Sequence, residues 1–91
     1  MKRDARLAAE QVRLMYDKYR SARAEFDLAA DQFRMARERH ANGDLSSNRL
    51  LDIETALTAA QSAKAASQAD YWMALALWYY ATGSTRLQEG F

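Results

Sequence analysis

The feature that most constrains the fold is a single break near the middle of an otherwise continuous helical pattern. Gly43 is the residue at this break that adopts a positive φ without penalty, so it can end a helix in a left-handed cap. Asp44, Ser46 and Asn48 follow, and their side chains accept hydrogen bonds from the free amides that start a new helix. A stop signal followed directly by a start signal predicts a hairpin of two antiparallel helices.

These signals set the expected boundaries. We predict an all-α fold, an antiparallel helical hairpin of the coiled-coil type, in one domain that spans residues 1–91. Gly83 is expected to end the second helix in the same way that Gly43 ends the first. The expected segments are a helix over 4–41, a turn over 42–46, a helix over 47–82 and a tail over 83–91.

The first helix carries apolar residues alternately three and four positions apart, which is the repeat of a coiled-coil seam. One core position of this seam holds mostly large residues and the other mostly alanine, so two helices can approach closely and still fill the space between them. The series is Ala5, Ala8, Val12, Met15, Tyr19, Ala22, Phe26, Ala29, Phe33 and Ala36, and it then reaches His40.

The same spacing resumes in the second helix. Lys64 and Ser67 weaken the middle of this second series, where the helix is rich in alanine. The series is Leu50, Ile53, Leu57, Ala60, Lys64, Ser67, Tyr71, Ala74, Trp78 and Ala81.

Each helix also carries a second apolar line beside its seam. Because a helix in a two-stranded coil needs only one seam, the second line predicts further neighbours. The two lines are Leu7, Leu14, Leu28 and Met35 in the first helix, and Ala56, Ala59, Ala63, Ala66, Met73, Leu77 and Tyr80, interrupted by Asp70, in the second.

A hairpin alone cannot cover this much apolar surface, so we expect copies of the chain to associate. Two hairpins would pair into a four-helix bundle, or several into a larger assembly like an α-barrel. The side chains expected to be hidden by self-association are Phe26, Phe33, Leu57, Tyr71, Trp72 and Trp78.

Composition excludes several functional classes. A net charge of +1 argues against nucleic acid as a partner, and no apolar run reaches the length of a membrane span, so we expect no membrane insertion by this segment. The chain has no cysteine and a single histidine, His40, whose expected role is capping or packing. It lacks phosphate-binding, nucleophile-elbow and zinc-protease motifs. We therefore expect no catalytic residue, metal or cofactor, and no enzyme activity.

The spacing around the turn carries a family likeness. Leucine and alanine steps follow the glycine, and the series ends on a tyrosine-rich segment closed by a second glycine. The chain resembles, from about Arg39 to Gly83, the C-terminal helical hairpin of TolC-like outer-membrane efflux proteins. The residues that carry the likeness are Arg39-His40-Ala41-Asn42-Gly43-Asp44-Leu45-Ser46, Leu50-Leu51-Asp52, Leu57, Ala60, Tyr71, Ala74 and Ala81-Thr82-Gly83.

The resemblance implies a role in transport. In that family such hairpins form a helical tunnel across the periplasm, and the turn docks on the hairpin of a membrane-fusion adaptor protein. The chain would then be a fragment or stand-alone version of the tunnel, located in the periplasm at the outer membrane. By the same resemblance Arg49 and Asp52 would lie at the channel aperture. The residues expected to meet the adaptor are Asn42, Gly43, Asp44 and Leu45.

The sequence also departs from the family. His40 replaces the usual tyrosine, and the polar Asn42 and Asp44 replace apolar residues beside the glycine. The chain has one hairpin where the family has two, and no signal-peptide pattern begins it. The alternative is a structural coiled-coil protein that assembles with itself, has no transport role and, as a stand-alone chain, stays in the cytoplasm.

Overall fold

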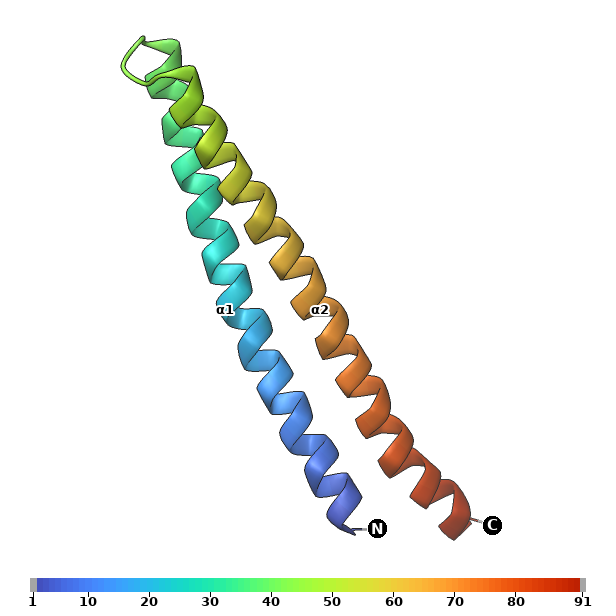
Figure 1. The fold of residues 1–91 in the computed structure, drawn as a ribbon. Coiled ribbons are helices and arrows are strands. Elements are labelled where there is room, and N and C mark those ends of the chain that lie inside the picture. Colours follow the sequence, from blue (N-terminus) through green and yellow to red (C-terminus); the bar gives the residue numbers. More distant parts are fainter. Residues whose placement is uncertain (1, 91) are drawn as a thin grey trace. The chain divides into compact units, whose positions relative to one another are not determined.

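The chain forms two long helices that pack against each other as a hairpin, in a computed structural model that describes the backbone of residues 2–90 and the side chains of residues 5–82. Helix α1 spans Lys2–Ala41 and helix α2 spans Ser47–Gly90 (Figure 1). Residues 42–46 connect them, and the described backbone contains no strand. The all-helical hairpin predicted from the sequence is confirmed.

The second helix is longer than its sequence indicates. We expected it to end at residue 82 and a tail to follow over 83–91, whereas α2 continues to Gly90. A glycine inside a helix costs only about 1 kcal/mol relative to alanine. Arg86, Leu87 and Gln88 follow Gly83 and favour helix, so the glycine is carried through. The expected tail is corrected accordingly, and residue 91 lies outside the described residues.

The chain divides into two compact units. The turn unit is Arg20–Ala65, and the terminal unit combines Met1–Tyr19 with Ala66–Phe91. Each unit contains a segment of α1 and a segment of α2.

Within both units the helices meet along the seam that the three–four spacing predicts, here called the inner seam. Every inner-seam residue of α1 from Ala5 to His40 is buried or half-buried, and the same holds for α2 from Leu50 to Tyr71. The most deeply buried side chains are small: Ala22, Ala36, Ser67 and Ala74. Small residues at these positions let the two helix backbones approach closely.

Aromatic contacts hold the inner seam of the terminal unit. The ring of Tyr71 stacks on Tyr19, with centroids 6.3 Å apart and planes 18° apart, and lies tilted against Tyr16 at 5.5 Å. Beside these rings, Lys18 Nζ lies 3.9 Å from an Asp70 carboxylate oxygen. Stacked and tilted rings of this kind are worth about 0.5–1.5 kcal/mol each beyond the area that they bury.

The turn unit uses a cation in its inner seam. Lys64 Nζ lies 4.5 Å from the centroid of the Phe26 ring, within the range of a cation–π interaction. The lysine that interrupts the apolar series therefore places its charge over an aromatic ring, which explains how the inner seam tolerates it.

The hairpin leaves much apolar surface exposed. The large apolar side chains that are more than half exposed include Leu7, Leu14, Leu28, Met35, Leu51, Trp72, Met73, Leu77, Tyr79 and Tyr80. Among the described residues no large side chain is fully buried. One inner seam therefore uses only part of the apolar surface that the sequence provides.

Candidate interaction surfaces

The turn closes α1 with a complete Schellman motif. Gly43 has φ 81°, in the left-handed region that the sequence indicates. Its amide donates to the carbonyl of His40 at 3.0 Å, and the amide of Asp44 donates to the carbonyl of Arg39 at 2.8 Å. These two bonds satisfy carbonyls that the end of a helix otherwise leaves without partners.

The start of α2 is capped two residues later. The amide of Arg49 donates to Ser46 Oγ at 3.2 Å, which is the geometry of a serine N-cap. His40 Nε2 lies 3.1 Å from Ser47 Oγ, so the single histidine joins the end of α1 to the beginning of α2. The sequence prediction that His40 has a capping or packing role agrees with this contact.

The four residues expected to meet an adaptor all lie in this turn. Asn42, Gly43 and Asp44 are exposed, and Leu45 is half-buried. Leu45 precedes the N-cap and Leu50 is four residues after it, which are the positions of a hydrophobic staple. The turn therefore presents one amide, one carboxylate and bare backbone to a partner, on a framework fixed by caps on both sides.

The two residues expected at a channel aperture lie in the first turns of α2. Arg49 and Asp52 are both exposed. Arg49 lines an open groove of about 390 Å³ between the helices of the turn unit, together with Gln32, Met35, Ala36, Arg39, Leu45 and Ile53. Asp52 is not among the lining residues.

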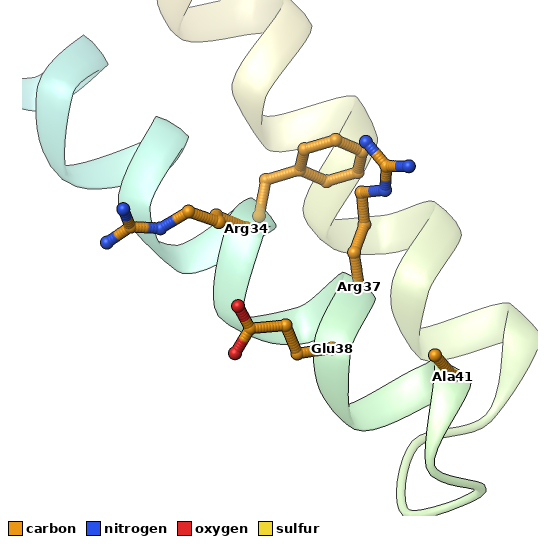
Figure 2. A pocket seen from close by; sticks show the side chains of 5 residues that line it. Arg34, Arg37, Glu38 and Ala41 are labelled. Carbon is orange, nitrogen blue, oxygen red and sulfur yellow. The ribbon is translucent and has the colours of Figure 1, made fainter.

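A second hollow in the turn unit lies along α1, with a volume of about 400 Å³ (Figure 2). Its residues are Phe33, Arg34, Arg37, Glu38 and Ala41. The guanidinium carbon of Arg37 lies 5.9 Å from the centroid of the Phe33 ring, and Arg34 extends to the other side, where it pairs with Asp31 at 3.6 Å. The arginines diverge and the hollow is open, so its side chains do not converge on a common point.

The terminal unit has an open groove of its own. It measures about 310 Å³ and is lined by Gln11, Met15, Asp70, Met73, Ala74 and Leu77. The apolar members of this groove include side chains from the second line of α2.

The six residues expected to mediate self-association fall into two groups. Phe26, Phe33, Leu57 and Tyr71 are half-buried in the inner seam, where Phe26 and Tyr71 contact side chains of the other helix. Trp72 and Trp78 are exposed, Trp72 to 60%. The two tryptophans are therefore the members of the set that have most surface left for a second molecule.

The second apolar lines of both helices are exposed, and the predicted site residues did not include them. The outer line of α1 (Leu7, Leu14, Leu28 and Met35) is 52–60% exposed. The outer seam of α2 consists of Ala56, Ala59, Ala63, Ala66, Asp70, Met73, Leu77 and Tyr80, and all of these except the half-buried Asp70 are exposed. Their spacing could have identified them as site residues, because it already marked them as lines lying beside the inner seam.

Two further features of the described residues concern metal ions and membranes. No group of three or more histidine, cysteine, aspartate or glutamate side chains among the described residues could hold a metal ion. Within the same residues, neither helix has a stretch long and apolar enough to cross a membrane.

Comparison with protein-family models, with curated protein sequences and with solved structures finds no match to this chain.

Proposed function

We propose that the chain is a two-sided packing module, a helical hairpin that pairs its own helices along one seam and lies beside further helices along another. The observation that carries this proposal is the exposure of the outer line of α1 and the outer seam of α2. Apolar residues at heptad spacing that a chain leaves exposed are typical of surfaces buried by another helix.

The module acts in a particular assembly, the periplasmic helical tunnel of a TolC-like outer-membrane efflux channel. The resemblance of Arg39 to Gly83 to the hairpin of that family supports this assignment. In this role the hairpin transports nothing by itself and catalyses no reaction. It forms part of a wall, and its turn docks on a membrane-fusion adaptor protein.

The geometry of the turn supports the docking role. The Schellman motif and the Ser46 cap fix the backbone on both sides, while Asn42 and Asp44 remain exposed. A preorganised, exposed turn loses little conformational entropy when a partner binds.

The experiment that tests the docking role compares two exposed aspartates. We expect the chain to bind the isolated helical hairpin of a membrane-fusion adaptor weakly, and Asp44→Lys to weaken that binding at least five-fold in a titration followed by fluorescence anisotropy. The matched control is Asp17→Lys, which makes the same change on the exposed side of α1 in the terminal unit. Equal binding by the two variants would contradict the role of the turn.

A structural protein that assembles with copies of itself is the second candidate. The same exposed outer line and outer seam favour it, since they serve self-assembly without any use of the turn. The two candidates therefore differ at the turn. An assembly that forms in full but binds no adaptor hairpin would favour the structural protein.

A further inference from the structure

We propose that the open groove of the turn unit binds a water-soluble amphipathic carboxylate, of the chemical class of a medium-chain fatty acid. Its carboxylate lies between Arg39 and Arg49, and its apolar chain lies along the groove. This groove, here called the arginine groove, is the one of about 390 Å³ that residues of both helices line. The inference goes beyond the proposed function, because it concerns a small ligand and needs neither an adaptor nor a second copy of the chain.

Two arginines, one from each helix, lie near the same level of the arginine groove. His40 Nε2 and Ser47 Oγ are 3.1 Å apart and join the two helices beside the turn. Arg39 directly precedes the histidine of this contact, and Arg49 lies two residues after the serine. Because a helix rises 1.5 Å per residue, both arginines are within about 3 Å of the contact along the helix axes. The groove therefore carries two like charges at its turn end.

Neither arginine has a carboxylate partner in the described part of the chain. The ion pairs of that part join Lys18 to Asp70 and Arg34 to Asp31. No aspartate or glutamate is among the residues that line the groove. Two like charges at one level repel each other, and an anion between them replaces the repulsion by two attractive contacts. Since a guanidinium binds a carboxylate through two parallel hydrogen bonds, this end of the groove favours a carboxylate.

The rest of the arginine groove is mostly apolar. Ala36 is buried, and Leu45 and Ile53 are half-buried. Met35 is 52% exposed, so its side chain has surface left for a ligand to cover. A ligand that carries an apolar chain behind its charged group therefore gains from both parts of the groove, since covering apolar surface is favourable.

The size of the groove favours a small molecule as the occupant. The residues of α1 that line it run from Gln32 to Arg39, a rise of about 10 Å. Its volume of about 390 Å³ falls within the range of roughly 300–1,000 Å³ found for small-molecule sites. One alkyl chain fits this length, whereas a partner helix of several turns would extend well beyond it.

The two helix caps hold the backbone of both arginines. The carbonyl of Arg39 accepts the amide of Asp44 at 2.8 Å, within the Schellman motif that ends α1. The amide of Arg49 donates to Ser46 Oγ at 3.2 Å, within the cap that begins α2. Because these bonds fix the backbone before a ligand arrives, binding has to order only the two exposed side chains.

The experiment uses sodium decanoate as the probe, below the concentration at which it forms micelles, with the full chain at one fixed concentration. Amide chemical shifts in proton–nitrogen NMR spectra report where and how tightly it binds. We expect saturable shifts centred on Ala36, Leu45 and Ile53. Decyltrimethylammonium has the same chain with a cationic headgroup, and acetate has the carboxylate without the chain. Each should bind at least ten-fold more weakly than decanoate, and equal binding by either would overturn the proposal.

Charge variants test the two arginines. Arg39→Gln and Arg49→Gln each remove one charge and keep a residue of good helix propensity. We expect each to weaken decanoate binding at least five-fold, with helicity by circular dichroism unchanged. The matched control is Arg23→Gln, which makes the same change at an exposed residue of the turn unit that does not line the groove, and which should bind as the natural chain does. Equal affinity of all three variants for decanoate would overturn the proposal.

Discussion

Gly43 determines the turn through its backbone conformation rather than through crowding. A Cβ built on this residue would meet no atom within 4 Å, so a side chain there has space, but its φ of 81° is one that other residues rarely adopt. The cost of a substitution is therefore the conformational strain of the left-handed region alone, and it depends on the residue type.

We predict that Gly43→Val destabilises the hairpin by about 1–2 kcal/mol, because a β-branched residue disfavours positive φ. Gly43→Asn should cost clearly less, since asparagine tolerates the left-handed conformation. Urea unfolding followed by circular dichroism, at one fixed protein concentration, gives both values. Equal stability of the valine and asparagine variants would show that backbone strain at Gly43 does not set the cost.

At the scale of the helices, the inner seam is the most predictable part of the molecule. Its three–four spacing identified the buried and half-buried side chains of α1 from Ala5 to His40, and those of α2 from Leu50 to Tyr71, Lys64 among them. The spacing could not show that Lys64 would lie over Phe26, because that contact depends on the relative level of two segments far apart in the sequence. A lysine in a heptad series predicts only a weak point.

The end of α2 and the assignment of the aromatic residues were less predictable, for two different reasons. Gly83 costs the helix about 1 kcal/mol relative to alanine, and the helix preference of the residues after it offsets this cost. A single glycine therefore does not determine where the helix ends. Tyr71 and Trp72 are adjacent in a segment that is apolar all round, so the pattern alone does not separate the ring in the inner seam from the one that is exposed.

We predict that Lys64→Gln lowers the free energy of unfolding by about 0.5–1 kcal/mol. Glutamine has a similar length and helix propensity but no charge to place over the Phe26 ring. Lys64→Arg should retain most of the stability, since a guanidinium also stacks on an aromatic face. Thermal unfolding of the three proteins in the same buffer measures the difference. Equal midpoints for the glutamine variant and the natural chain would show that the contact contributes nothing.

At the scale of the whole molecule, the proposed function depends on the exposed apolar surface. The inner seam accounts for one face of each helix, and the outer line and outer seam remain exposed apart from the half-buried Asp70. The sequence indicated this two-sidedness through its second lines. It did not identify these lines as site residues. The prediction favoured large aromatic side chains, and two of these, Phe26 and Phe33, are half-buried in the inner seam.

The measurement that tests this account most directly is the mass of the chain in solution at micromolar concentration, by sedimentation equilibrium, with helicity recorded on the same sample. We expect a mass well above 10.4 kDa. Leu77→Asp, which places a charge in the outer seam, should shift the mass toward 10.4 kDa. Ala76→Asp, which makes a like change at an exposed neighbour on another face of the helix, should leave the mass unchanged. A fully helical monomer of 10.4 kDa for the natural chain would contradict the account.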